Sequence, residues 1–453
     1  MEKKKNRKKA ALIGILFLTT VCGCSGGQSA QTEKETKSLG TQEEYCLKLY
    51  IPWSVSSERG VAMQKIVDSY NMENKSEYQV ILLEDNGENE GNIQDIPLDG
   101  TADVYIISHE YVQYLGEKGK LEDLINGIQR EKEYFEEDLW NLGVVDGRNY
   151  GIPWAGYSMA LIYNRDILME AGVDPADIQN SEDLVEACAK VEENTRAFGI
   201  GLVGAECDDL SWMVNQFIYG YGGQIVSSNG TEININSPGA RHAVSFYKNV
   251  LGLYAQPTWK SDTGVDVMTA FRNGQVAFEI QSLWGINDIS PEEKHFELGV
   301  IPLRQIGLKS EVKTLMLAVP AGLEVKKKRA ASLFMEYMIS ETGQLKIMEG
   351  EYRRDREEYC PFRLPLRKGI AECEGFQEYS QYGVFLDGFT NTSIDIPVPA
   401  WNNVKQGVYL RELHRFMNDE ISIDDMLLEV KTRGTEIMVK EKNTQMYESL
   451  VKN

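Results

Sequence analysis

The sequence contains little cysteine and little histidine, and neither residue occurs at a metal-binding spacing. There are 7 cysteines and 4 histidines in 453 residues, without a Cys-x-x-Cys or a His-x-x-x-His pair. The five cysteines beyond Cys24 are scattered and odd in number, which argues against a disulfide scaffold, although Cys360 and Cys373 could pair. The sequence therefore predicts no metal site and no cofactor.

Signatures of catalysis are also missing. No Gly-rich loop with a following lysine is present to hold phosphate. The run from Gly156 to Ala160 approaches a nucleophile elbow around Ser158 but lacks the final glycine. We therefore predict no catalytic residues. Paired carboxylates for glycoside hydrolysis stay open as an alternative, because the 69 acidic residues allow many pairs and only their separation in space is diagnostic.

An excess of positive charge is missing, since 69 acidic residues outnumber 47 basic ones, and long apolar runs are missing beyond the N-terminus. The formal net charge is −22, so nucleic acid is not expected as a partner. After the first 23 residues, no apolar run approaches the length that a membrane-spanning helix needs.

The N-terminus has the pattern of a secretory signal. Basic residues precede an apolar run from Ala10 to Val21 that is too short for a stable anchor. The following Val-Cys-Gly-Cys resembles the lipobox of bacterial lipoproteins, which makes residues 1–23 a signal peptide and Cys24 the lipidated residue. The alternative is an ordinary signal peptide with an incidental cysteine. Residues 24–44 are almost free of apolar side chains and are predicted to form a flexible tether.

The remaining residues, enough for two domains, begin with an α/β pattern. Alternating Leu47, Leu49 and Ile51 predict a strand, and residues 58–73 place apolar side chains on one helical face. The segments YQVILLE and Ala102–Ile107 predict two further strands. Strand, helix, strand in this order favours a parallel sheet.

Three later helices are predicted from their apolar stripes and caps. One begins near Asn180 and Ser181, which suit an N-cap. A second carries Ala330, Leu333, Phe334 and Tyr337 on one face. A third follows Ser422, which forms a capping-box pattern with Asp425.

Several segments, taken in order, resemble the extracellular solute-binding proteins of carbohydrate importers, the family of maltose-binding and multiple-sugar-binding proteins. The likeness covers roughly Leu47 to Met438 and is carried by these segments: ADVYIISHEYVQYLGEKGKLEDL, YGIPWAGYSMALIYNRDILMEAGVDPADIQNSEDL, AFRNGQVAFEIQSLWGINDI, ELGVIPL, TLMLAVPAGLEVKKKRAASLFMEYMISETGQ, IPVPAWNNVKQGV and SIDDMLLEVKTRGTEI. The stretch Tyr352–Ser380 departs from the family pattern.

The resemblance implies an α/β, two-lobed fold like that of periplasmic binding proteins, in which the lobes close over a ligand by hinge motion. Each lobe is expected to hold a mostly parallel sheet flanked by helices, built from discontinuous pieces. Crossings are expected near residues 152–155, between about 274 and 284, and beyond residue 344. These crossings assign residues 45–152 and about 275–345 to the first lobe, and 153–274 and about 346–450 to the second.

A sugar site needs aromatic rings for the C–H faces and polar groups for the hydroxyls. Ring candidates at the lobe junctions are Trp53, Trp154, Tyr157, Trp212, Trp284 and Trp401, with Trp154 favoured most. Polar candidates are Glu58, Ser108 and Glu110, because ligands of open parallel sheets lie beyond the carboxyl ends of the strands. The competing interpretation is a core position for each tryptophan and a solvated or structural role for each acid.

The sequence thus predicts a lipid-anchored, extracytoplasmic, monomeric binding protein that is not an enzyme. It would capture a carbohydrate ligand and deliver it to the membrane permease subunits of an ABC importer. The alternatives are a surface-anchored carbohydrate-active enzyme, or the same fold binding a phosphorylated polyol or an oligopeptide.

Overall fold

A computed structural model describes residues 45–73, 76–83, 96–124, 129–227, 230–289, 296–354, 357–394, 398 and 400–451. The chain divides into two units, Met1–Tyr45 and Cys46–Asn453, and the following description concerns the second unit. The predicted signal peptide, Cys24 and the tether lie outside the described residues.

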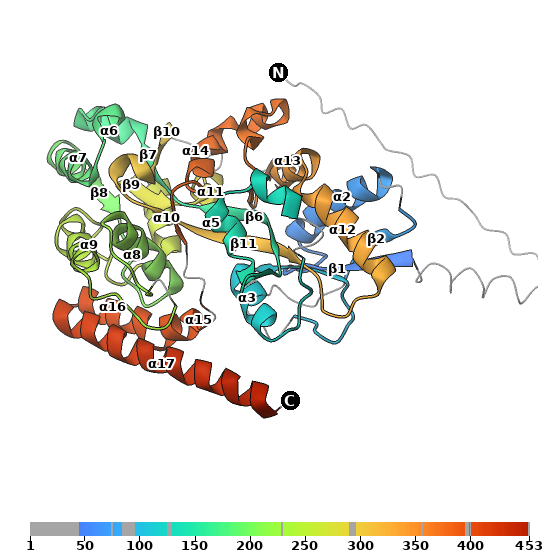
Figure 1. Cartoon of the computed structure of the whole chain (residues 1–453). Helices are drawn as coiled ribbons and strands as arrows, with labels where there is room; N and C mark the ends of the chain where they lie inside the picture. Colours follow the sequence, from blue (N-terminus) through green and yellow to red (C-terminus); the bar gives the residue numbers. More distant parts are fainter. Residues whose placement is uncertain are drawn as a thin grey trace, which may run out of the picture. The chain divides into compact units, whose positions relative to one another are not determined.

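In the described residues, the unit has two large sheets, around which two lobes are built, and two small two-stranded sheets, β4-β5 and β12-β13. Its buried apolar residues form two clusters, and the first of these extends from the first lobe to the lobe junction. In Figure 1, α2 and α12 lie beside the strands of the first sheet, and α6 to α9 surround those of the second. The two-lobed α/β fold expected from the sequence is confirmed. Within the described residues, no helix combines the length and the apolar character that crossing a membrane requires.

The first lobe is built from the N-terminal part of the unit and from a later return of the chain. The N-terminal part contributes β1 Cys46–Tyr50, α2 Glu58–Glu73, β2 Gln79–Leu82, β3 Val104–Ser108, α3 His109–Glu117, η3 Gln129–Tyr134, α5 Glu137–Asn141, β4 Val144–Val145, β5 Arg148–Asn149 and β6 Ile152–Ser158. The return contributes β11 Ser310–Ala318, α12 Val325–Ile339, α13 Glu341–Glu349, β12 Glu351–Arg353, β13 Glu358–Cys360, β14 Leu364–Pro365, η7 Ile370–Glu372, η8 Glu374–Tyr382, α14 Gly383–Asp387 and β15 Thr392–Ile394.

The second lobe is also discontinuous. Its central part contains β7 Ala160–Asn164, α6 Arg165–Ala171, η4 Pro175–Asp177, α7 Ser181–Asn194, β8 Phe198–Gly201, α8 Asp208–Gly220, α9 Pro238–Asn249, η5 Leu251–Leu253, α10 Gly264–Arg272, β9 Val276–Gln281, α11 Leu283–Asn287, β10 Leu298–Pro302 and η6 Leu303–Ile306. The C-terminal part adds α15 Trp401–Val404, the π-helix η9 Lys405–Tyr409, α16 Leu410–Met417 and α17 Ile423–Val451.

The sheets are mixed, so the prediction of mostly parallel sheets is wrong. In the first sheet, in the order β14-β6-β11-β3-β1-β2, β1 pairs in parallel with β2 and β3, whereas β11 runs antiparallel to β3 and β6. In the second sheet, in the order β10-β7-β9-β8, β7 runs antiparallel to both β10 and β9. In the first sheet, the antiparallel pairs of β11 with β3 and β6 join strands that the chain forms before and after its passage through the second lobe.

The predicted lobe boundaries need correction. The prediction assigned 45–152 and about 275–345 to one lobe and 153–274 and about 346–450 to the other, but β6 belongs to the first sheet as far as Ser158. Strands β9 and β10 stay in the second lobe because they pair with β7. Residues 346–394 belong to the first lobe, where β14 pairs with β6. The chain therefore crosses between β6 and β7, between η6 and β11, and between β15 and α15.

Local signals place several helices as predicted. Helix α7 begins after Asn180, whose side chain accepts a hydrogen bond from Asp183 N at 2.8 Å. Ser422 and Asp425 form the predicted capping interaction, since Asp425 N donates to Ser422 Oγ at 3.1 Å and Ser422 Oγ donates to Asp425 Oδ2 at 2.7 Å. Such caps satisfy amide groups that the first helical turn leaves without partners.

Candidate functional site

Three of the predicted aromatic side chains meet where the two lobes join. Tyr157 lies on β6 of the first lobe, Trp212 on α8 and Trp284 on α11 of the second. The ring of Tyr157 lies 5.5 Å from that of Trp212 and 4.6 Å from that of Trp284, measured between centroids. The Tyr157 ring meets Trp284 edge-on at 74°, an arrangement that aromatic pairs favour. These three rings form a cluster with one member from the first lobe and two from the second.

A cavity of about 220 Å³ opens beside the two tryptophans. It lies between the starts of α8 and α10 and the turn from β9 into α11. Its lining combines aromatic, thioether and polar side chains: Met159, Asp209, Trp212, Met213, Gly264, Val265, Met268, Gln281 and Trp284. A concave, mostly apolar site with a few polar groups is the usual form of a small-molecule site.

The polar groups of the cavity are held in fixed positions. Trp284 Nε1 donates to Gln281 Oε1 at 2.7 Å, so Gln281 orients the indole. Asp209 Oδ2 accepts from Gly264 N at 2.9 Å. A side chain at position 264 would meet this carboxylate, because a Cβ there would lie 2.8 Å from Asp209 Oδ2. Gly264 therefore allows the carboxylate to reach the start of α10.

Charged groups from both lobes lie near one another. In the first lobe, Lys313 Nζ lies 4.0 Å from Glu110 Oε1. In the second, the buried Lys405 lies 3.5 Å from Asp208 Oδ1. Burial alone would raise the pKa of Glu110, but electrostatic interactions with Lys313, His109 and Lys405 outweigh it and hold that pKa well below its usual range. The influence of Lys405 on Glu110 reaches from one lobe to the other.

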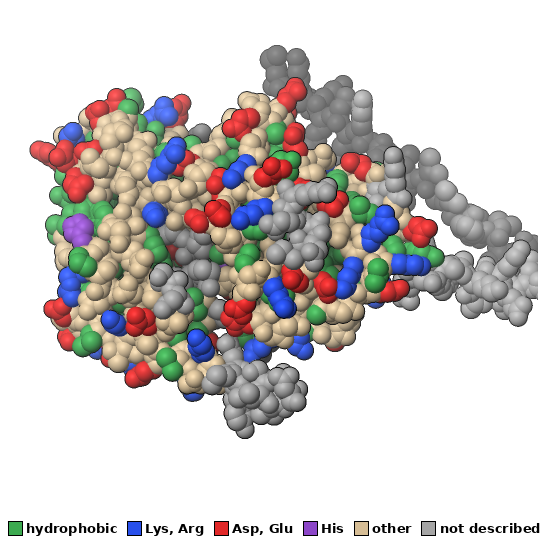
Figure 2. All heavy atoms as spheres, in the orientation of Figure 1, with side chains coloured by type: hydrophobic (Ala, Val, Ile, Leu, Met, Phe, Trp, Pro, Cys, Tyr) green, Lys and Arg blue, Asp and Glu red, His purple; other side chains and the backbone are tan. Residues whose placement is uncertain are grey.

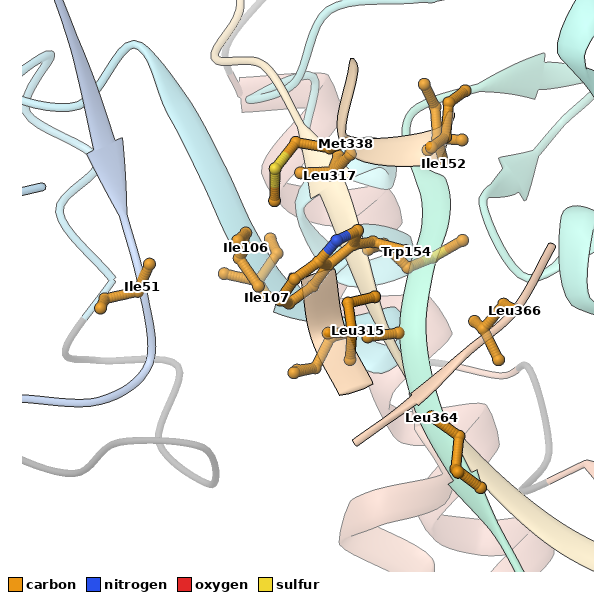
Figure 3. Close-up of a cluster of buried hydrophobic side chains, with 14 of the residues drawn as sticks. Ile51, Ile106, Ile107, Ile152, Trp154, Leu315, Leu317, Met338, Leu364 and Leu366 are labelled. Atoms are coloured by element: carbon orange, nitrogen blue, oxygen red, sulfur yellow. The ribbon is translucent and has the colours of Figure 1, made fainter. Parts of the chain in front are cut away.

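The structure places Trp154 in the first core and not at a cleft surface. Its side chain is 0% exposed, and Figure 3 shows its ring among Ile106, Ile107, Leu315 and Met338. The pairing of β6 with β11 shifts by one residue here, so that Ala155 pairs with Leu315 and Pro153 with Met316, which leaves Trp154 without a partner in the ladder. A β-bulge of this kind redirects a side chain. The prediction that Trp154 stacks on a ligand is therefore corrected.

Two other tryptophans are also core residues. Trp53 is 0% exposed and packs edge-on against Phe362 at 5.2 Å. Trp401 is 2% exposed and packs against Tyr409 at 5.4 Å in the second core. Neither ring has an open face, so their predicted ligand contacts are corrected as well.

The remaining polar candidates lie in different environments. Ser108 is buried at the end of β3, two residues before Glu110 on α3. Glu58 lies at the start of α2 and accepts from Arg354 Nε at 2.6 Å. The structure thus brings Glu110 toward the second lobe, whereas Glu58 belongs to an ion pair at the surface of the first.

Several cavity residues were not among the sequence predictions. Asp209 and Gln281 provide its polar groups, and Met159, Met213 and Met268 provide much of its apolar wall. The sequence offers a signal for two of them. Asp209 lies three residues before Trp212 at the start of a helix, and Gln281 ends the strand VAFEIQ, in which Glu279 is the other polar residue. Methionines on apolar helix faces are indistinguishable from core residues in sequence.

A second hollow, of about 770 Å³, lies along the other face of α10. Thr269 and Ala270 line it, whereas Val265 and Met268 of the same helix line the smaller cavity. Phe198 is its one aromatic residue, so it lacks the pair of rings that a sugar site uses.

Groups suited to metal binding are not assembled in the part of the chain that the structure describes. There, no three His, Cys, Asp or Glu side chains gather to hold a metal ion. His109 Nδ1 lies 3.2 Å from Thr314 Oγ1, and His414 Nδ1 lies 2.7 Å from the carbonyl oxygen of Gly204. Cys360 and Cys373 are not joined by a disulfide. On the face that Figure 2 shows, the coloured basic side chains are interspersed with acidic ones.

Comparison with known proteins gives consistent matches. Residues 65–354 match the family described as bacterial extracellular solute-binding protein. A binding protein of Brucella abortus is 25% identical over 331 residues, which cover 70% of this chain and 76% of that protein. The maltodextrin-binding protein of Bacillus subtilis is 23% identical over 309 residues, 65% of this chain and 68% of that one. Among solved structures, the sugar-binding protein MalE from Xanthomonas citri has a TM-score of 0.73 at 18% identity and covers 88% of this chain and 98% of that chain.

Proposed function

This chain belongs to the family of bacterial extracellular solute-binding proteins, and from that premise we propose that it binds a sugar or short oligosaccharide between its lobes. In this proposal it works outside the cytoplasm and passes the sugar to the permease subunits of an ABC importer. The maltodextrin-binding relative supports the choice of ligand class.

The observation that carries the proposal is the aromatic cluster of Tyr157, Trp212 and Trp284. The two tryptophans border the cavity in the second lobe, and the tyrosine of the first lobe lies against both. A ligand held by the tryptophans therefore also affects the position of the first lobe. This is the geometry by which a bound molecule can favour one arrangement of two lobes over another.

The cavity contains the two kinds of contact that a sugar ring needs. The half-buried faces of Trp212 and Trp284 suit the C–H faces of a pyranose. The Asp209 carboxylate and the Gln281 amide suit hydroxyl groups, and a hydrogen bond to a charged acceptor is the stronger kind. At about 220 Å³ the cavity is smaller than the roughly 300–1,000 Å³ of a pocket for a drug-sized ligand. We therefore propose that it holds one terminal sugar unit of a longer ligand.

A melting-temperature screen tests this function. A protein beginning after residue 24 is heated with maltotriose, other oligosaccharides, single sugars, glycerol 3-phosphate or a tripeptide. A ligand that binds the folded form alone adds about 2.7 kcal/mol of stability at one hundred times its dissociation constant. We expect a shift of several degrees with at least one oligosaccharide.

The same samples separate binding from catalysis. Each stabilising compound is incubated overnight with the protein and then analysed by chromatography. An unchanged compound supports a binding protein, whereas conversion of excess sugar into products contradicts it. Stabilisation by the phosphorylated polyol or the peptide alone would retain the fold and reject the sugar.

A further inference from the structure

A segment of the first lobe reaches across to the helix that carries Trp284. This segment, residues 357–389, is called the clasp here. It includes β13, β14, η7, η8 and α14, and it lies beyond residues 65–354, which match the family. Phe376, Tyr382 and Phe385 anchor it in the first core, with exposures of 2%, 4% and 0%.

The clasp contacts the second lobe through the side chain of Asn287. Asn287 Nδ2 donates to the carbonyl oxygen of Pro361 at 2.8 Å, and the Tyr382 hydroxyl donates to Asn287 Oδ1 at 2.7 Å. Both ends of the amide are thus used, and both contacts are buried. A satisfied buried amide fixes orientation, and the loss of one partner leaves a polar group unpaired.

A second contact between the clasp and the second lobe is much more exposed. Arg304 Nη2 of η6 lies 2.9 Å from Asp387 Oδ1 of α14, but the arginine side chain is 61% exposed. Exposed ion pairs of this kind contribute little, typically about 0–1 kcal/mol. Of these two polar contacts, the buried amide of Asn287 is the one that fixes orientation, and it adds to the apolar packing of Leu283 in the first core.

Helix α11 depends on such contacts for its place. It has five residues, Leu283–Asn287, and helices this short are not stable by themselves. One end is held by the hydrogen bond from Trp284 Nε1 to Gln281 within the second lobe. The other end, Asn287, is held by the clasp. The indole of Trp284 lies between these two attachments and borders the cavity.

We propose that the clasp of the first lobe positions Trp284 of the second lobe through Asn287, so that Tyr382 and Asn287 are positioning residues for solute binding. The effect on binding rests on the proposed function. The effect on α11 does not depend on it. The two are measured separately.

The first measurement is amide hydrogen exchange of the free protein. The amides of Gly285, Asp288 and Ile289 donate to Ser282, Trp284 and Ile286, and they report on the integrity of α11. The variant Tyr382→Phe removes the hydroxyl and keeps the ring. We expect these amides to exchange about fivefold faster, the change that loss of one hydrogen bond gives. Tyr379→Phe is the matched control, because Tyr379 lies in the same η8 and packs on Phe376. Equal exchange in the parent and in Tyr382→Phe would overturn the proposal.

The second measurement is a double-mutant cycle for binding. The probe is the oligosaccharide that stabilises the parent protein most in the melting screen. We expect Tyr382→Phe and Asn287→Ala each to weaken binding by roughly threefold to tenfold. In a Trp284→Ala background, the same changes should have almost no further effect, because residues that act through one another are not additive. Equal losses in both backgrounds would mean that the clasp does not act through Trp284. If no sugar stabilises the parent, the proposed function fails, and the exchange measurement still decides whether the clasp positions α11.

Discussion

At the scale of single residues, the five tryptophans predicted to contact the ligand divide into two groups that differ in burial. Trp53, Trp154 and Trp401 lie in the two cores, whereas Trp212 and Trp284 are half-buried beside the cavity. Substitution by alanine should therefore mainly reduce ligand binding in the half-buried group and mainly reduce stability in the core group.

We expect Trp284→Ala to weaken binding of the screened oligosaccharide at least tenfold (about 1.4 kcal/mol) with little loss of stability. Trp154→Ala should instead cost roughly 3–5 kcal/mol of unfolding free energy, because it leaves a cavity in a packed core. Calorimetric titration and urea denaturation of both variants measure the two effects. A Trp284→Ala protein that binds like the parent but melts much earlier would contradict the assignment.

The sequence identified the correct residue types at the lobe junction but not which of them face a ligand. Trp154 and Tyr157 follow the same Gly-x-Pro turn, and both were predicted to reach the ligand. The one-residue shift in the pairing of β6 with β11 places the Trp154 ring in the core. No local sequence pattern predicts such a bulge. Tyr157, Trp212 and Trp284 come together through pairing of segments far apart in the chain, so their ligand contacts stay a prediction.

At the scale of elements, strand β9 carries a buried carboxylic acid. Glu279 is 0% exposed, and burial, with a smaller contribution from the Asp288 carboxylate, raises its pKa to about 8. Asp288 itself pairs with Arg272 at 2.7 Å. Because the pKa is 4.5 in the unfolded chain, the folded protein binds one more proton than the unfolded chain between those values. Stability is therefore lost as the pH rises from about 4.5 to about 8.

The variant Glu279→Gln should remove this dependence. The glutamine keeps the size of the side chain and stays neutral, so we expect it to be more stable than the parent at pH 8 by a few kcal/mol, since each pKa unit corresponds to about 1.4 kcal/mol. At pH 5 the two proteins should be much closer. Urea denaturation at both pH values measures this, and a constant difference between the proteins would show that Glu279 is ionised in the fold.

Helices and strands with clear local sequence signals were predicted correctly, whereas the lobe to which several of them belong was not. Helices 58–73 and 181–194 follow from their apolar stripes and caps. Strands β7 and β9 are buried along their whole length, as is β3 in the other lobe. Such strands read alike in sequence, and only hydrogen bonding between distant segments decides which sheet each one joins. The predicted second and third crossings were misplaced for this reason.

At the scale of the whole molecule, the N-terminal sequence predicts a membrane attachment through Cys24. The variant Cys24→Ala should appear as uncleaved precursor or leave the membrane fraction, because the lipid would be the anchor. Fractionation with a blot for the mature protein measures this, and Cys22→Ala is the matched control. A mature-sized Cys24→Ala protein that stays in the membrane fraction would contradict the prediction.

The position of β11 has a consequence for the newly made chain. This strand lies between β3 and β6 in the first sheet, yet it begins only at Ser310. Until residues 310–318 have been synthesised, β3 and β6 lack the neighbour that joins them, and contacts so distant in sequence form slowly. The first lobe therefore cannot fold while most of the chain is still emerging from the ribosome. This delay leaves time for a protein that works outside the cytoplasm to be exported as an extended chain, before its first lobe folds.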